Sequence, residues 1–175
     1  MRLLKGEAIV KYPLLALVSL AAVTGCANDV SGLSLSGVPF VEATVNGVRW
    51  QVDSAGIFAF VRLSDSLFYI NAQHPAVTDG LLLNFRTADT LGSYTLNDVR
   101  DPLPIGAFYK YDSPLDTLPR VYATVREHVG SVQLVALDTL QHIATGRFEF
   151  DAQELGGTTV LRVRGGAFRV RYRLE

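Results

Sequence analysis

The sequence contains a single cysteine, Cys26, among 175 residues. One cysteine cannot form a disulfide within the chain, so an internal covalent cross-link is excluded as a source of stability. The chain does not need one, because a domain of about 150 residues buries roughly 70% of the surface that its unfolded chain exposes. A leftover cysteine in an exported protein points to special chemistry at that residue.

The sequence also lacks an excess of basic residues, with 16 lysine and arginine residues against 17 aspartate and glutamate residues. Three of the basic residues and one of the acidic residues lie within residues 1–25, which leaves 13 basic and 16 acidic residues in the rest of the chain, a net charge of −3. Nucleic-acid-binding domains are strongly basic. The sequence therefore predicts no nucleic-acid partner.

The apolar segment near the amino terminus is too short for a membrane-spanning helix, which requires about 20 residues. Residues 13–23 form an uncharged run of 11 residues, and Arg2, Lys5 and Lys11 precede it. A basic start, a short apolar stretch and small residues after it are typical of a secretory signal peptide. We therefore predict a cleaved leader over residues 1–25.

The end of this leader, Val23-Thr24-Gly25-Cys26, resembles the lipobox of bacterial lipoproteins. The resemblance implies that the signal peptidase recognises Val23, Thr24 and Gly25, that cleavage follows Gly25, and that Cys26 carries diacylglycerol and further palmitate-like acyl chains. Two or three such chains anchor a protein firmly to a membrane. We expect attachment to the outer membrane of a bacterial envelope, with the domain in the periplasm or at the cell surface. The alternative is an ordinary leader followed by a coincidental cysteine.

The remainder of the chain divides into a tether and one domain. Residues 26–38 are rich in serine, glycine and asparagine, which predicts a flexible linker of about 20 Å. Residues 39–175 show short β-rich segments every 8–12 residues and no sustained helical period. These features predict an all-β domain, a single antiparallel β-sandwich or partly open barrel built from successive hairpins. After the first hairpin, the expected strands are 57–63, 67–72, 80–86, 93–96, 106–111, 121–126, 131–138, 143–152, 158–164 and 167–174.

Asn46-Gly47 lies between two alternating runs and is the strongest short-range signal for a β-hairpin. A two-residue turn there pairs Val45 with Val48, Ala43 with Trp50 and Val41 with Val52. These apolar pairs all point to one side of the hairpin. A slip of one residue would expose the whole set, so the register is well determined.

Gly165-Gly166 is the corresponding signal near the carboxyl terminus. A second two-residue turn there pairs Val163 with Phe168 and places Arg162 opposite Arg169. Like charges placed opposite each other are unfavourable. Two interpretations follow: outward acids on strand 143–152 neutralise the row, or the row docks an anionic partner, because arginine binds planar anions bidentately. The candidate patch for such a partner consists of Arg162, Arg164, Arg169, Arg171 and Arg173.

Four segments of the domain carry a recognisable pattern: residues 43–50, 92–96, 146–152 and 166–170. Together they resemble a family of small lipoproteins of unknown function from Bacteroidota-type bacteria. Its members begin with an A-x-V-N-G-x-x-W segment and end with a G-x-F-x-F-x-A strand followed by a short aromatic strand. The resemblance implies export, lipidation and a β-rich fold, and it implies no catalytic residue. Gly165-Gly166 stands where the family pattern has Asn-Gly.

The residue types needed for catalysis or metal binding do not form a recognisable motif. His74, His128 and His142 are far apart in the sequence, and Asp138 with His142 would supply only two metal ligands. No G-x-S-x-G nucleophile elbow occurs. Acids two residues apart on a strand, such as Glu149 and Asp151, indicate a solvated face rather than a glycosidase pair. We therefore expect no catalytic residue, no metal and no cofactor.

These observations favour a membrane-anchored envelope protein that acts as a non-catalytic binding or structural module. Its expected partners are the membrane, through the lipid anchor, and an envelope protein or glycan. The sequence leaves the oligomeric state open. One alternative is a lipocalin-like carrier, which would contain a large apolar cavity. Another is a hydrolase, which would show clustered polar groups with perturbed protonation in a cleft.

Overall fold

The computed structural model describes residues 37–74, 79–87, 90–96, 105–113 and 116–175. In these residues the chain is all-β, as predicted, and forms one large, mostly antiparallel sheet that is not closed into a barrel. A 3₁₀ turn at Ser54–Gly56 is its short helical element. The strands are β1 (Phe40–Val45), β2 (Val48–Asp53), β3 (Ile57–Arg62), β4 (Leu67–Gln73), β5 (Gly80–Arg86), β6 (Gly92–Leu96), β7 (Ile105–Lys110), β8 (Arg120–Ala123), β9 (Gly130–Asp138), β10 (Ile143–Glu154), β11 (Val160–Arg171) and β12 (Arg173–Leu174).

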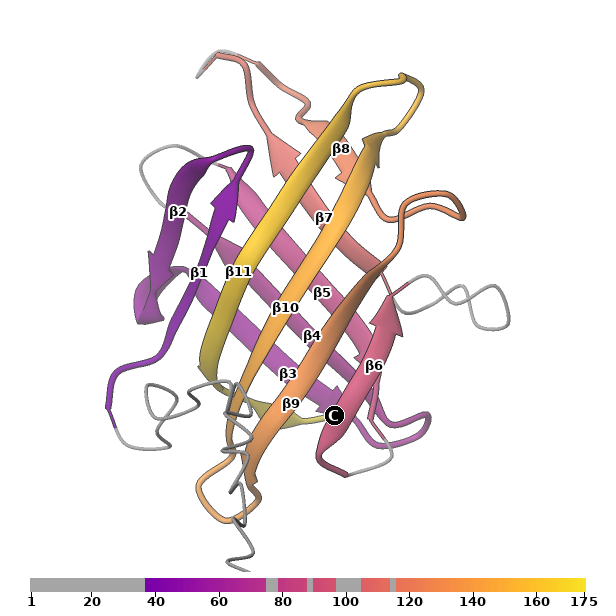
Figure 1. The fold of residues 1–175 in the computed structure, drawn as a ribbon. Coiled ribbons are helices and arrows are strands. Elements are labelled where there is room, and N and C mark those ends of the chain that lie inside the picture. The colour runs from indigo at the N-terminus through magenta and orange to yellow at the C-terminus, as the bar shows by residue number, and fades with distance from the viewer. Residues whose placement is uncertain (1–36, 75–78, 88–89, 97–104, 114–115) are drawn as a thin grey trace, which may run out of the picture.

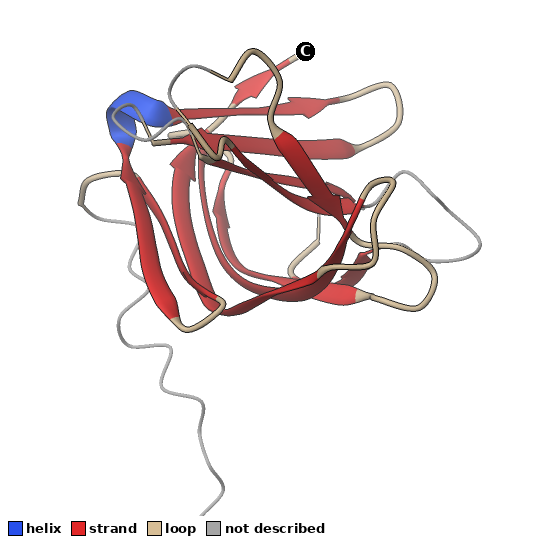
Figure 2. Cartoon of the chain, turned by 90° about the horizontal axis from the view of Figure 1, so that it is seen from above, coloured by secondary structure: helices blue, strands red, loops and turns tan. Residues whose placement is uncertain are grey.

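The sheet bends over on itself into two facing layers. Strands β3, β4, β5 and β7 form one layer, and β9, β10 and β11 cross in front of them in Figure 1. Figure 2 shows the same layers from above. The layers are joined twice: β8 pairs with both β7 and β10, and β12 pairs in parallel with β3.

The core lies between the layers and is built by strands that alternate in burial. Phe68 and Phe85 on neighbouring strands stack with ring centroids 5.3 Å apart, and Phe150 and Phe168 fill the opposite layer. Burying a phenylalanine side chain stabilises the fold by about 1.5–3 kcal/mol. Gly146 belongs to this packing, because a Cβ atom there would lie 2.4 Å from the Phe168 ring.

The first hairpin has the predicted register. Val45 pairs with Val48, Ala43 with Trp50 and Val41 with Val52. Asn46 and Gly47 have φ angles of 47° and 84°, as a type I′ turn requires. The Asn46 side chain also accepts a hydrogen bond from the Arg162 backbone at 2.8 Å, so the turn is fixed to β11.

The second predicted hairpin is wrong, because Gly165-Gly166 lies inside one continuous strand. Residues 160–171 pair with β10 on one side and β1 on the other. Phe148 opposes Gly166 whereas Phe150 opposes Val163, so β11 contains one extra residue at this point. Gly165 has a φ of +58°, the left-handed conformation of a glycine bulge. The bulge lets Leu161, Val163 and Phe168 all face the core.

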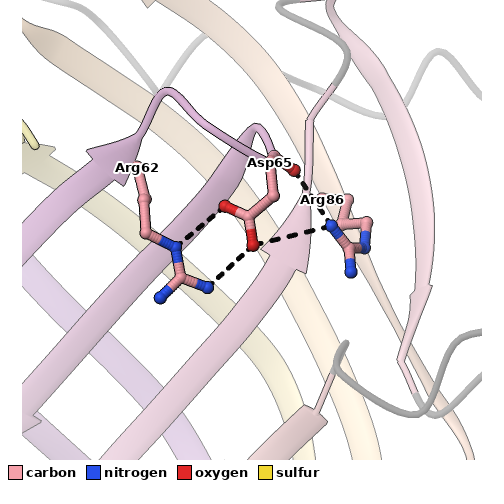
Figure 3. A network of polar contacts seen from close by, with 3 residues as sticks. All are labelled: Arg62, Asp65 and Arg86. Carbon is pink, nitrogen blue, oxygen red and sulfur yellow. Dashed lines mark hydrogen bonds and ion pairs between the residues drawn. The ribbon is translucent and has the colours of Figure 1, made fainter.

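A polar network fixes the turn between β3 and β4 to β5 (Figure 3). Arg62 donates two hydrogen bonds to the Asp65 carboxylate, at 2.9 and 2.7 Å. Arg86 donates to the Asp65 backbone carbonyl at 3.0 Å and approaches the carboxylate at 3.7 Å. The hydrogen bonds from Arg62 lower the pKa of Asp65, so the ionised carboxylate is favoured in the folded state.

We expect Asp65→Asn to lower the denaturant midpoint at pH 7, because the ionised partner of both arginines is lost. A carboxyl whose folded pKa is depressed stabilises the fold above its unfolded pKa, and this stabilisation is lost as the pH falls through the folded value. The difference between variant and parent should therefore shrink below about pH 4. Glu127→Gln, at an exposed site, is the matched control. Equal midpoints for both variants at pH 7 would contradict the role of this network.

Candidate functional site

The predicted lipidation site lies outside the described residues. Cys26 and the recognition residues Val23, Thr24 and Gly25 all fall within residues 1–36, where the structure gives no description. The lipid attachment therefore remains a prediction from the sequence.

Four of the five predicted patch arginines are exposed and Arg169 is buried, and the structure does not gather them on two facing strands. Arg162, Arg164, Arg169 and Arg171 follow one another along β11, and Arg173 lies on β12. From Arg162 to Arg171 the row follows β11 over at most roughly 30 Å, at about 3.3 Å per residue. Arg162 lies opposite Asp151 on β10. The sequence predicted that acids of strand 143–152 would lie beside the arginine row, and this pairing agrees with it.

Two of the exposed arginines, Arg164 and Arg173, already have partners within the protein. Arg164 forms an ion pair with Asp151 and donates to the Phe150 carbonyl at 2.9 Å. Arg173 pairs with Glu175 at 3.0 Å and lies 4.2 Å above the Phe58 ring. The side chains of Arg162 and Arg171 are solvent-exposed.

Arg169 anchors the start of the domain. Its side chain is only 8% exposed, and Nε donates to the Val38 carbonyl at 3.1 Å. Gly37 packs so closely that a Cβ atom there would lie 2.5 Å from the guanidinium. The Phe40 ring lies on the other side, 5.6 Å from Cζ of Arg169.

We expect Arg169→Ala to destabilise the domain by about 1.5–3 kcal/mol, the usual range for hydrogen bonds made by a charged group. Arg171→Ala, two residues along the same strand and exposed, should change stability by less than about 0.5 kcal/mol. Chemical denaturation of both variants provides the comparison. Similar losses of unfolding free energy in the two variants would contradict a special stabilising role for the buried Arg169.

A groove of about 600 Å³ lies on the outer face of β1, β6, β9, β10 and β11. Ligand sites commonly have volumes of about 300–1,000 Å³. We call it the cross-strand groove. Its lining residues are Phe40, Glu42, Ser93, Ser131, Gln133, Arg147, Phe148, Glu149, Gly165, Gly166 and Ala167.

One row of paired residues runs across the groove from strand to strand. Ser93 pairs with Gln133, Gln133 with Arg147, Arg147 with Ala167, and Ala167 with Glu42. Residues that pair in this way have side chains on the same face of the sheet. The long polar side chains therefore stand beside the small Ser93 and Ala167, and this difference in size creates the hollow.

A second row lies beside the first, at the glycine bulge. Ser131 pairs with Glu149, and Gly165 and Gly166 follow on β11. Gly166 must remain a glycine, because a Cβ atom there would lie 2.5 Å from the Phe148 ring. Gly165 has open space where a Cβ atom would lie, so the bulge leaves the groove without a side chain at this position.

The groove contains both hydrogen-bond donors and acceptors. Two carboxylates, Glu42 and Glu149, line it together with one guanidinium, Arg147. Arg49 pairs with Glu42 at 3.0 Å at the rim. The amide of Gln133 and the hydroxyls of Ser93 and Ser131 donate and accept. The polar side chains of the groove therefore offer both donors and acceptors to a molecule with hydroxyl groups.

Titratable residues with shifted pKa values lie away from this groove. Burial raises the pKa of Asp79, whose carboxylate accepts a hydrogen bond from the Tyr111 backbone at 3.4 Å. Burial also raises the pKa of Tyr109, which donates to Asn71 at 2.9 Å. Both residues belong to the β4–β5–β7 side of the molecule.

The histidines do not form a metal site in the described part of the chain. No group of three or more histidine, cysteine, aspartate and glutamate residues there is close enough to hold a metal ion. His128 makes a β-bridge with Val125, and His142 contacts Tyr172. Over the same residues, no helix has the length and apolar character needed to span a membrane.

Comparison of the chain with family models, curated proteins and solved structures found no match. The resemblance to small lipoproteins therefore remains a prediction from the sequence. The groove and its lining residues are therefore the basis for a functional proposal.

The sequence contained only a partial signal for the groove. The alternation of strand 143–152 places Arg147 and Glu149 on the outer face, as the structure has them. Their neighbours Ser93 and Glu42 come from segments more than 50 residues away in the chain. Knowing that these strands lie beside β9 and β11 requires the strand order, which hydrophobic alternation does not encode.

Proposed function

We propose that this protein is a lipid-anchored binding module of a bacterial envelope, and that the cross-strand groove binds a hydroxyl-rich ligand such as an envelope glycan. The lipobox-like sequence at Cys26 supports the anchor. The observation that supports the ligand is the paired row from Ser93 to Glu42, in which two neutral polar side chains, one basic and one acidic side chain lie on one face of five strands.

The charges in the groove favour an uncharged ligand over an anion. Glu42 and Glu149 would repel phosphate or carboxylate groups, whereas sugar hydroxyls donate hydrogen bonds to carboxylates and accept them from Arg147 and Gln133. Phe40 adds an apolar wall against which the C–H face of a sugar can pack. The anionic partner predicted for the arginine row is thus a weaker candidate for this groove.

A binding role fits the groove better than catalysis. The groove is an open hollow on a sheet face, and Glu149 and the Gln133 side chain are exposed to solvent. Catalytic acids and bases usually sit in water-poor clefts that shift their pKa values. Side chains fixed on paired strands are well suited to binding, because little conformational entropy is lost when the ligand binds.

We expect Cys26→Ala to abolish labelling by radioactive palmitate and to release the protein from the membrane fraction, because the thiol is the only acyl acceptor of this type in the chain. Ser36→Ala, in the same tether, should keep the label. Cell fractionation and autoradiography give both readouts. The proposed anchor would be overturned if the Cys26→Ala protein still took up the label and stayed in the membrane fraction.

We expect Gln133→Ala to weaken glycan binding by about 2- to 12-fold, the loss associated with one hydrogen bond of about 0.5–1.5 kcal/mol. Ala167→Trp should abolish binding, because the indole would fill the floor of the groove. Affinity electrophoresis through gels containing neutral soluble polysaccharides, such as xylan, β-glucan and mannan, measures the retardation. Gln141→Ala, at an exposed turn, is the matched control.

The salt dependence of the retardation distinguishes glycan binding in the groove from binding of an anion by the arginine row. Retardation by an uncharged glycan should persist at high ionic strength, whereas an exposed ionic contact weakens as charges are screened. Equal retardation of the Gln133 and Gln141 variants, or no retardation by any polysaccharide of the panel, would count against the groove as a glycan site.

A further inference from the structure

The sheet ends at an edge strand, β2, on the side of the first hairpin. β2 is the last member of the strand order and has β1 as its one neighbour among the described strands. Figure 1 places β2 at the left border of the molecule, and its residues Arg49, Gln51 and Asp53 are exposed. An edge strand presents a row of backbone N–H and C=O groups to which another strand can pair.

The hairpin turn determines which backbone groups of β2 point away from β1. A two-residue turn makes Val45 and Val48 a hydrogen-bonded pair, and such pairs alternate along an antiparallel ladder. Val48 and every second residue after it therefore direct their backbone groups toward β1. Arg49, Gln51 and Asp53 direct theirs away from β1, toward the edge.

β2 lacks most of the features that keep edge strands apart. Proteins protect such edges with lysine, proline, bulges or charges that point inward. β2 has the sequence VRWQVD, without lysine or proline, and its ladder with β1 has no register shift. Two other strands also have one neighbour, but β6 carries no charge that could select a partner and β12 has only two residues.

The two charges of β2 make the strand complementary to a second copy of itself. In an antiparallel pair centred on Gln51, Arg49 of each copy lies opposite Asp53 of the other copy. Opposite charges in such positions are favourable, and like charges are unfavourable. A centre at Arg49 would set two arginines opposite each other, and a centre at Asp53 would do the same with two aspartates. In the register centred on Gln51, the three residues with outward backbone groups meet one another and can exchange their hydrogen bonds.

We propose that two copies of this protein pair through their β2 edges in the register centred on Gln51, so that the sheet continues from one copy into the other. The charged groups are available for this contact. Arg49 uses Nη2 for Glu42 and Gln51, which leaves Nη1 and Nε. Asp53 accepts a hydrogen bond from the Ala55 backbone with Oδ1, at 3.2 Å, which leaves Oδ2.

This pairing joins the cross-strand grooves of the two copies. The paired row from Ser93 to Glu42 continues to Gln51, because Glu42 pairs with Gln51, and Gln51 lies at the proposed two-fold axis. The same row therefore runs from one groove to the other. Neighbouring strands lie about 4.8 Å apart, so the two β1 strands that border the grooves are separated by roughly 14 Å. This consequence rests on the proposed function, and it implies that a long glycan chain contacts both grooves.

The register is tested by chemical bridging in the full chain with Cys26→Ala, which contains no other cysteine. The reagent is dibromobimane, which bridges two thiols only at short range and then fluoresces. Gln51→Cys should give a fluorescent dimer, because Gln51 faces itself with Cα atoms about 5.5 Å apart. Arg49→Cys, also exposed on β2, should not, because the two copies of Arg49 are roughly 14 Å apart in this register.

The ion pairs are tested by Asp53→Asn, compared by analytical ultracentrifugation in the same Cys26→Ala background. Asparagine caps a helical turn as well as aspartate does, so the variant should fold. Two exposed ion pairs are lost, and we expect the dissociation constant of the dimer to rise about 2- to 30-fold at low salt. The rise should be smaller at high salt, where charges are screened. Glu127→Gln, at an exposed acid away from β2, should leave the constant unchanged.

Three results would overturn the proposal: a Cys26→Ala protein that stays monomeric at every concentration reached, as much bridging in Arg49→Cys as in Gln51→Cys, or equal dissociation constants for Asp53→Asn and Glu127→Gln at low salt. None of these measurements uses a glycan, so they remain valid if the groove binds none.

The joining of the grooves has its own readout in the affinity gels. Asp53→Asn should reduce the retardation by a long polysaccharide because it weakens the dimer, whereas Gln133→Ala should reduce the retardation and leave the dimer intact. Equal retardation of Asp53→Asn and its parent by a polysaccharide that binds the parent would overturn the joined groove.

Discussion

The pairing of β10 with β11 is the constraint on which the rest of the structure depends. These are the two longest strands, and their ladder runs from Ile143 opposite Arg171 to Gln153 opposite Val160. β10 also pairs with β8 and β9, and β11 pairs with β1 and leads directly into β12. Both connections between the layers therefore begin on this ladder. Loss of its register would separate the layers and open the core.

The cross-strand groove arises from a departure from this regular ladder. It forms where β11 contains an extra residue and Gly165 brings no side chain. On either side of this position, paired polar residues from neighbouring strands line the hollow. The groove is polar because it lies on the outer face of the sheet, away from the core.

Hydrophobic alternation predicted the local structure well. It identified the extents of the strands to within a few residues and the complete register of the Asn46-Gly47 hairpin. It failed at Gly165-Gly166, because a two-residue turn and a glycine bulge both direct Leu161, Val163 and Phe168 toward the core. Only the partners supplied by β10 and β1 distinguish the two. For the same reason the groove was not predicted, since its walls come from strands that are distant in the chain.

The contact between Arg169 and the Val38 carbonyl determines how the domain responds to mechanical load. β1 lies between the edge strand β2 and β11, and chain tension applied from the amino-terminal side would otherwise pull at its first residue. Because Arg169 belongs to β11, such a force passes into an interior strand before it reaches the β1 ladder. A force that pulls on the chain before β1 therefore acts on β11 as well as on the edge hairpin.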